Sequence, residues 1–303
     1  MTIIFPTSYA IAKRSWPATS RIRDFQDRHA LTWQQRPNLT DVLNGDLWIE
    51  HEGEGPLIAT AIHAGHKVRR ELLPVLALDE TARSREEDPY TDYWVKAAPT
   101  WLVPTRSRFE VDLNRSRDEA VYKTPEVAWG LHVWKRPLDE NAVSISLEEY
   151  DAFYAELGQL LSRMAGHHRH FVIWDLHAYN FRREGPNASP ADPDLNPDIN
   201  IGTGSLDRSR WGGLVDRFMH DLATFDFLGH HLDVRENVKF KGRQLAQWIH
   251  HHFPESACVL SIEFKKFYMD EWTGVGEIEQ IQALRKALES TIPGLMEQLE
   301  KVQ

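Results

Sequence analysis

The sequence contains very little cysteine. Among its 303 residues there is a single one, Cys258, so no disulfide can form within the chain. A chain without disulfides suits a reducing compartment, and we expect a cytoplasmic protein. Cys258 lies in the apolar run 257–260, which favours a buried structural thiol over a reactive nucleophile.

The sequence also lacks the long apolar segments that membrane insertion requires. No run approaches the roughly 18 apolar residues that span a bilayer, and residues 1–16 lack the apolar core of a signal peptide. The formal net charge of -10 argues against nucleic acid as the main partner, because phosphate binding requires a basic face. Local basic groups, among them Lys239, Lys265 and Lys266, are predicted to lie on solvated faces.

Several motifs of nucleotide-binding and hydrolytic proteins are absent. No Gly-x-Gly-x-x-Gly, P-loop, Gly-x-Ser-x-Gly or paired Cys-x-x-Cys pattern occurs in the sequence. These absences argue against a dinucleotide fold, a serine hydrolase and a zinc finger. Hydrophobic residues make up 42% and charged residues 26%, the balance of a soluble globular protein with a sizeable core.

Short apolar runs alternate with helical patterns along the chain. Strands are predicted at 47–50, 57–62, 101–103, 109–113, 171–175 and 258–264. A capping box, Ser146 with Glu149, predicts a helix that begins there. Further helices are predicted at about 208–227, 241–252 and 278–290, with Pro293 interrupting the last. The proline-rich stretch 185–197 is predicted to be a loop. This alternation favours a three-layer α/β domain.

Two histidines stand at predicted strand ends, where open α/β sheets usually build their sites. His63 follows the strand 57–62 and is itself followed by small residues, and His177 follows the apolar strand that begins at Phe171. Imidazole is a favoured zinc ligand, so both are candidate metal ligands, with satisfied structural histidines as the alternative. Asp175 lies two residues before His177 and therefore points to the same side, where it can orient a ligand or a catalytic water.

Glu263 is a carboxylate within a hydrophobic strand. Burial of an unpaired glutamate is costly, so the residue must be paired, lie near a metal, or be functional. A general base acting on water needs such a desolvated carboxylate. The alternative is a salt bridge to Lys265, which shares its strand face.

The segment 108–115 alternates like a strand and ends in an amide and a guanidinium, Asn114 and Arg115. An arginine can bind a carboxylate through two charge-assisted hydrogen bonds, and a neighbouring asparagine can donate another. Arg108 and Arg115 thus provide positive charge for two tasks, stabilising an oxyanion and anchoring a substrate carboxylate.

Taken in order, these segments resemble the N-formylglutamate amidohydrolase family over roughly residues 56–275. The resemblance includes the turn 62–65, Thr91 with Asp92, and the segments 108–115, 175–177, 198–203, 237–242 and 262–271. More distantly, the layout is similar to aspartoacylases and zinc carboxypeptidases. The resemblance implies a zinc-carboxypeptidase-like fold, α/β/α with a mixed, mostly parallel central sheet. We expect one domain over residues 1–303, with 1–46 as an N-terminal extension packed on it.

The resemblance also implies site roles. One Zn²⁺ per chain would be held by His63, His177 and a carboxylate. Glu263 would serve as the base, Arg108 would face the carbonyl oxygen, and Asn114 with Arg115 would hold the substrate carboxylate. Asn237 and Tyr268, in the matching loop and closing segment, are further candidate substrate-binding residues.

The third ligand departs from the pattern of the more distant relatives. Carboxypeptidases and aspartoacylases use His-x-x-Glu, whereas this chain has His66 at that position. Asp92 is the first choice for the missing carboxylate, and Asp88 and His66 itself are the alternatives.

The implied activity is zinc-dependent hydrolysis of the amide of an N-formyl or N-acyl amino acid that bears a carboxylate, such as N-formyl-L-glutamate. The partner is then a small molecule. The alternatives are another N-acyl amino acid deacylase or a carboxypeptidase-like enzyme, or an inactive relative that binds a carboxylated ligand or a protein.

Overall fold

A computed structural model describes residues 47–303. The predicted N-terminal extension, residues 1–46, lies outside this range. None of the helices formed by residues 47–303 combines the length and the apolar character needed to cross a membrane.

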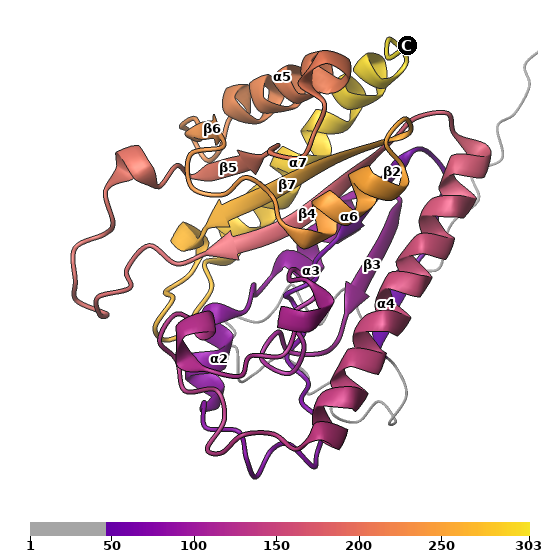
Figure 1. The fold of residues 1–303 in the computed structure, drawn as a ribbon. Coiled ribbons are helices and arrows are strands. Elements are labelled where there is room, and N and C mark those ends of the chain that lie inside the picture. The colour runs from indigo at the N-terminus through magenta and orange to yellow at the C-terminus, as the bar shows by residue number, and fades with distance from the viewer. Residues whose placement is uncertain (1–46) are drawn as a thin grey trace, which may run out of the picture.

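A seven-stranded sheet forms the centre of the fold, in the order β1-β3-β2-β4-β7-β5-β6 (Figure 1). The pairs β1–β3 and β5–β7 are antiparallel, and the other neighbours are parallel. The structure therefore confirms the prediction of a mixed, mostly parallel sheet. Its strands are β1 (Trp48–His51), β2 (Leu57–Thr60), β3 (Thr100–Pro104), β4 (Phe171–Tyr179), β5 (Ile199–Gly202), β6 (Val234–Glu236) and β7 (Ala257–Lys265).

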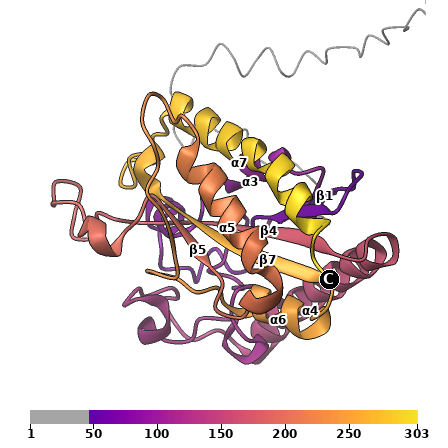
Figure 2. The same ribbon diagram turned by 90° about the horizontal axis from the view of Figure 1, so that it is seen from above.

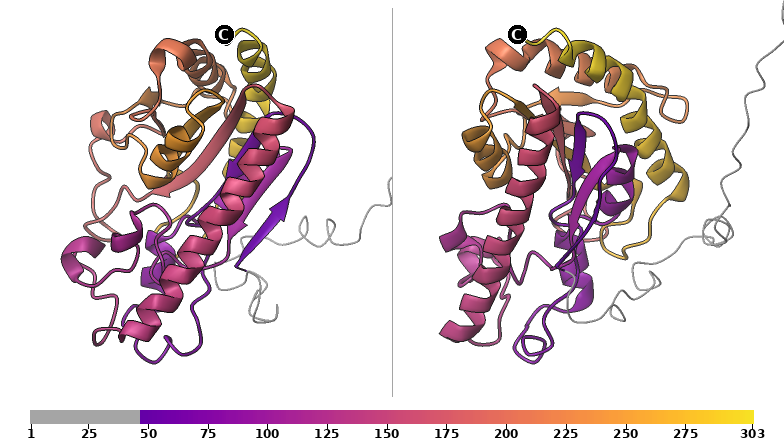
Figure 3. Two further views of the ribbon diagram at one scale, coloured as in Figure 1. Left: turned by 45° about the vertical axis from the view of Figure 1, so that its right-hand side comes forward. Right: turned by 90° about the vertical axis from the view of Figure 1, so that its right-hand side faces the viewer.

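Helices cover both faces of the sheet, which confirms the three-layer architecture (Figures 2 and 3). On one face lie α5 (Arg208–Thr224), α7 (Ile278–Leu299) and the short α3 (Thr91–Trp94), and their apolar side chains form one large core cluster with the sheet. On the other face, α4 (Glu140–His167) and α6 (Gln244–His252) form a second cluster. The short helix α2 (Glu80–Glu86) precedes α3 at one end of the sheet.

Alternation along β4 determines where the polar residues of this strand point. Val172 and Trp174 contribute to the cluster of α5 and α7, whereas Phe171 and Ile173 contribute to that of α4 and α6. Because side chains alternate between the faces of a strand, Asp175 and His177 continue the face of Ile173. The same alternation in β7 places Glu263 on this face, two residues after Ser261. The polar residues thus follow the apolar ones at the carboxyl end of the parallel strands.

The predicted strand at 109–113 is wrong. The segment forms consecutive turns, in which the amides of Glu110 and Val111 donate to the carbonyl of Ser107, and that of Arg115 donates to Asp112. All five residues from 109 to 113 are buried, so the apparent alternation does not separate an inner face from an outer one. Local backbone hydrogen bonds replace the ladder that a strand would need.

Two predicted helix limits are also wrong. Helix α4 begins earlier than the capping box suggests, because Asp139 is its N-cap and accepts a hydrogen bond from the amide of Ala142. Ser146 is instead buried inside the helix, where its hydroxyl accepts from Arg69. Helix α7 continues through Pro293 to Leu299, since its buried face packs on the sheet layer over the whole length.

The prediction of a buried thiol at Cys258 is confirmed, whereas the prediction of a solvated Lys266 is wrong. The thiol of Cys258 is buried, as predicted, and burial raises its pKa well above the ordinary value. Lys265 is half-buried and Lys239 is exposed, whereas Lys266 is only 1% exposed rather than solvated.

Candidate metal centre

The ends of two neighbouring parallel strands bring His63 and His177 together. In the register of β2 and β4, Thr60 lies opposite Asp175, so the chain that leaves β2 passes beside His177. The two rings are tilted against each other with centroids 4.9 Å apart, and both side chains are 3% exposed. The structure therefore brings together the two histidines that the sequence singles out as candidate ligands.

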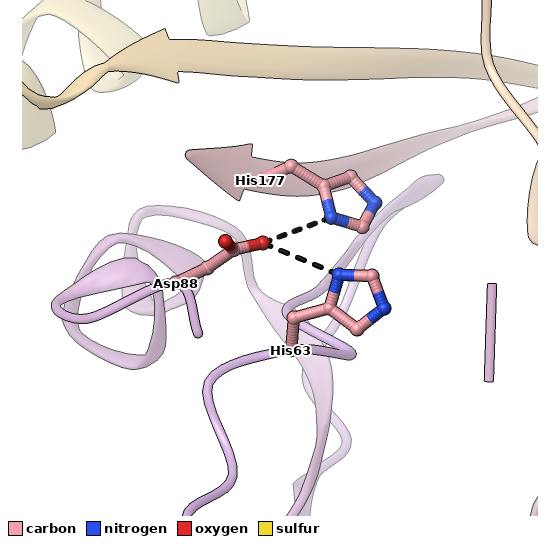
Figure 4. Close-up of side chains that lie close together, drawn as sticks. All are labelled: His63, Asp88 and His177. Carbon is pink, nitrogen blue, oxygen red and sulfur yellow. Dashed lines mark hydrogen bonds and ion pairs between the residues drawn. The ribbon is translucent and has the colours of Figure 1, made fainter. Parts of the chain in front are cut away.

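One carboxylate oxygen joins the two histidines (Figure 4). Asp88 Oδ2 lies 3.1 Å from His177 Nδ1 and 3.4 Å from His63 Nδ1. The three possible ligand atoms lie within 4.8 Å of one another, all from buried residues. Asp88 Oδ1 is buried and forms no hydrogen bond among residues 47–303. Two imidazoles beside a carboxylate with an unpaired oxygen can hold a metal ion.

The outer nitrogens of both rings face further carboxylates. His63 Nε2 lies 2.7 Å from Asp112 Oδ1, and His177 Nε2 lies 2.9 Å from Asp175 Oδ1. A carboxylate on the outer nitrogen orients the ring and leaves the inner nitrogen, here Nδ1, for a metal. Asp175 thus lies where the sequence predicts an orienting residue.

Asp112 is a residue of the site that was not predicted from the sequence. It is fully buried and contacts Arg108 at 2.9 Å as well as the hydroxyl of Tyr122. The sequence pattern that marks Glu263 also marks Asp112: each is an acidic residue inside an apolar run, here Val111-Asp112-Leu113.

The charges in this cluster shift the pKa values of its members. Burial opposes the ionisation of Asp88, but its hydrogen bonds to His177 and His63 outweigh burial and hold its pKa well below the ordinary value. Burial likewise opposes protonation of His177, yet Asp175 and Asp88 raise the pKa of this imidazole well above the ordinary value. The site therefore favours negative carboxylates and attracts positive charge to the inner nitrogens.

Glu263 lies directly opposite His177 in the register of β4 and β7. Part of its side chain faces solvent, but it lies deep enough that loss of hydration raises its pKa to about 7; His177 opposes this shift and Asp88 adds to it. No side chain among residues 47–303 forms a hydrogen bond or ion pair with its carboxylate. The alternative pairing with Lys265 is not formed, because Lys265 Nζ lies 2.6 Å from Asp198.

Arg108 and Arg115 lie beside Asp112, the carboxylate that contacts His63. Arg108 contacts Asp112, and the exposed indole of Trp129 covers its guanidinium at 4.7 Å from the ring centroid. Arg115 donates to the carbonyl of Val127 at 2.7 Å. The Nε atoms of both arginines are buried and have no hydrogen-bond acceptor among residues 47–303, although Arg115 Nε lies 3.7 Å from Asp112 Oδ2.

Asn114 belongs to the same cluster. Its Nδ2 lies 3.4 Å from His177 Nε2, and its Oδ1 accepts from the amide of Leu245. The amide is thus fixed beside His177, one of the two candidate metal ligands.

The third candidate ligand in the structure is Asp88, one of the two alternatives, rather than Asp92. Asp92 lies in the first turn of α3 and is not among the clustered ligand atoms. His66 is engaged elsewhere, since its Nδ1 lies 2.5 Å from Glu87 and its Nε2 accepts from Arg83 at 2.9 Å. With an arginine donating to Nε2, the proton of a neutral His66 lies on Nδ1.

Asn237 and Tyr268 make structural contacts. Asn237 has a left-handed backbone (φ 54°) after β6, and its side chain binds both the amide and the hydroxyl of Thr203. Tyr268 is fully buried, and its hydroxyl donates to the carbonyl of Pro89 at 3.1 Å. Their roles toward a substrate stay predictions.

Comparison with known proteins identifies relatives of this chain. Residues 55–269 match the family described as N-formylglutamate amidohydrolase. The crystal structure of N-formylglutamate amidohydrolase from Ralstonia eutropha JMP134 is similar with a TM-score of 0.66 at 20% identity, covering 84% of this chain and 98% of that one. A gene product from Agrobacterium tumefaciens is similar with a TM-score of 0.62 at 17% identity, covering 84% and 97%. No curated protein matches significantly.

The geometry predicts different effects of two isosteric substitutions on metal binding. Asp88→Asn should weaken binding of Zn²⁺ at least about 10-fold, because it removes the negative charge of the shared oxygen. Asp92→Asn is the matched control and should leave the affinity unchanged. Competition with a chromophoric chelator measures both affinities, and the reverse pattern would assign Asp92 as the ligand.

Proposed function

Because this chain belongs to the N-formylglutamate amidohydrolase family, we propose that it is a zinc-dependent hydrolase of N-acyl amino acids that bear a carboxylate. Its substrate class includes N-formyl-L-glutamate, which would be cleaved to L-glutamate and formate. The observation that carries the proposal is the cluster of His63, Asp88 and His177, with the unpaired carboxylate of Glu263 on the neighbouring strand.

The residues at the site suit a catalytic zinc ion. Two histidines and one carboxylate form a common ligand set of zinc hydrolases, which leaves a position open for water or substrate. When bound, Zn²⁺ supplies Lewis acidity, which polarises a carbonyl and makes water a better nucleophile at neutral pH. Asp112 is hydrogen-bonded to His63 Nε2 and orients that ring, and Asp175, 2.9 Å from His177 Nε2, places a negative charge beside the other ring.

Glu263 is the proposed general base. Its carboxylate accepts a proton from water as the water oxygen bonds to the carbonyl carbon of the amide. It returns this proton to the leaving nitrogen when the C–N bond breaks, which yields the free amine and the carboxylic acid. The absence of any ion-pair partner for Glu263 among residues 47–303 supports this role, because a salt bridge would hold the carboxylate away from a substrate.

Arg108 and Arg115 are proposed to divide the remaining tasks. Arg108, held by Asp112 close to His63, stabilises the oxyanion that develops on the amide carbonyl. Arg115, with Asn114, binds the substrate carboxylate and so fixes the amide relative to the base. The position of both guanidinium groups beside Asp112, which itself contacts His63, supports these roles.

The first test is release of formate from N-formyl-L-glutamate by protein from which zinc has been removed and then restored. Activity should be lost with the metal and return with one equivalent of Zn²⁺. Absence of release from every member of a panel of N-acyl amino acids and peptides, by protein that holds zinc, would favour the inactive, ligand-binding alternative. Release from other panel members alone would instead identify a different acyl or amino acid group.

Glu263→Gln should reduce kcat by about 10²–10⁴ while zinc content stays at the unmodified level, because the amide cannot accept the proton of water. Glu255→Gln, an exposed glutamate just before β7, is the control and should retain full activity. Formate release and metal analysis of the same samples separate loss of the base from loss of the metal. Full activity of Glu263→Gln would disprove the assignment of the base.

Arg115→Ala should raise KM for carboxylated substrates about 10–100-fold, since it removes charge-assisted hydrogen bonds to the carboxylate. Arg117→Ala is a control from the same segment, because Arg117 is exposed and pairs with the exposed Asp151. Steady-state kinetics should also show that Arg115→Ala discriminates less between N-formyl-glutamate and its ester or amide at the anchored carboxylate. An unchanged KM would remove the anchoring role.

A further inference from the structure

Lys266 is a buried lysine with no part in the proposed chemistry. It follows β7 directly, three residues after Glu263, in the short 3₁₀ helix Lys266–Tyr268. Its Nζ donates to the carbonyl of Arg85 at 2.6 Å and to that of Glu87 at 2.7 Å. These two acceptors are close neighbours, in sequence, of the candidate ligand Asp88. Lys266 therefore connects the segment after the base-bearing strand to the loop that carries Asp88.

This loop, residues 85–89, consists of the last two residues of α2 and the three residues that follow it. Each of its five carbonyl groups accepts a hydrogen bond from a side chain at a distance between 2.6 and 3.2 Å. In chain order, the donors are Lys266, Arg108, Lys266, Thr91 and Tyr268. The amide of Asp88 donates to the carbonyl of His63 at 3.0 Å. The amide of Glu87 donates to the carbonyl of Arg83 at 2.9 Å, so side-chain donors and a few backbone hydrogen bonds together hold this loop.

The charge of Lys266 suits its surroundings. Burial lowers the pKa of its ammonium group, and the negative charges of Asp88, Glu86 and Glu271 oppose that shift. An ammonium group has three N–H donors, which allows one side chain to bind two carbonyls at once. A buried ammonium is costly unless it is hydrogen-bonded and close to opposite charge, and Lys266 meets both conditions.

We propose that Lys266 is a positioning residue, which holds the loop of residues 85–89 so that Asp88 can share a metal ion with His63 and His177. It acts through Asp88 and touches neither metal nor substrate. Through its place after β7, it also fixes Asp88 relative to Glu263. This inference rests on the metal centre of the proposed function, and it concerns the affinity for the metal rather than the choice of substrate.

Electrostatics and positioning predict opposite effects when Lys266 is replaced by an apolar residue. Loss of a positive charge close to a cation site should strengthen binding of a cation, because a repulsion is removed. Loss of the two hydrogen bonds should release the loop and weaken binding, as substitutions outside the ligand shell of metal sites do. The sign of the change in affinity therefore decides whether positioning is the dominant role.

The experiment measures the affinity of the full-length protein for Zn²⁺ by competition with a chromophoric chelator, for Lys266→Met and for the unmodified protein. We expect affinity to fall about 10–100-fold in the variant. The visible absorption bands of the Co²⁺-loaded protein should change as well, since they report the geometry of the ligands. Tyr268→Phe, which removes only the hydroxyl that binds Pro89, should show a smaller change in the same direction.

Two controls separate positioning from general stability. Leu222→Ala removes a fully buried side chain in α5, within the core on the other face of the sheet, and should lower the melting temperature without changing Zn²⁺ affinity below it. Lys265→Met removes the neighbouring charge, which pairs with Asp198, and should also leave the affinity unchanged. If Lys266→Met does not fold, Lys266→Gln, which keeps a donor but no charge, takes its place and should bind Zn²⁺ more weakly.

Each outcome has a defined meaning. A lower affinity with a changed Co²⁺ spectrum, at a temperature where the variant is folded, supports the proposal. An unchanged or higher affinity overturns it while leaving the metal centre in place. A fall in affinity that Leu222→Ala reproduces at matched loss of stability also overturns it. Failure of the unmodified protein to bind Zn²⁺ would instead overturn the metal centre itself, and the positioning role with it.

Discussion

The geometry of the candidate metal centre depends on a single oxygen atom, Asp88 Oδ2, which lies between the Nδ1 atoms of His63 and His177. The three residues come from three separate segments: the turn after β2, the loop between α2 and α3, and the end of β4. Their meeting point is buried, and the outer nitrogens of both rings face two more carboxylates. Such a concentration of negative charge is costly without compensating cations, which is why a divalent metal suits the site.

The central sheet positions the site residues through the order of apolar and polar side chains along two strands. Along β4 and β7, the face toward α4 and α6 is apolar up to Ile173 and Val259, and polar from Asp175 and Ser261 onward. Asp175 and His177 therefore project at the end of the strand without disturbing the core. The other residues of the site come from loops, and most residues of the segments 85–89 and 107–115 are buried. Their backbone groups are satisfied by local bonds and by side chains, notably Lys266 and Arg108.

Much of the site could be predicted because strand ends are visible in a sequence. An apolar run that ends in a histidine, as at His63 and His177, predicts both the strand and the place of the ring, and an acid inside such a run identifies Glu263. The third ligand could not be predicted in the same way. Asp88 and Asp92 lie four residues apart in one loop and helix, and only the packing of that loop on His63 and on the residues after β7 decides which carboxylate reaches the histidines.

The sequence by itself determined the α/β class, the two strand-end histidines and membership of the family, because periodicity and local motifs are properties of contiguous residues. Two predictions from the sequence were wrong. Residues 109–113 were expected to form a strand but form buried turns, and Lys266 was expected to be solvent-exposed because of its charge but is buried. Tertiary structure alone decided these points, since a buried charge or a buried turn is stable only when partners distant in sequence satisfy it. For Lys266 those partners are backbone carbonyl groups far away in the sequence, and the carbonyl of Glu87 is 179 residues away.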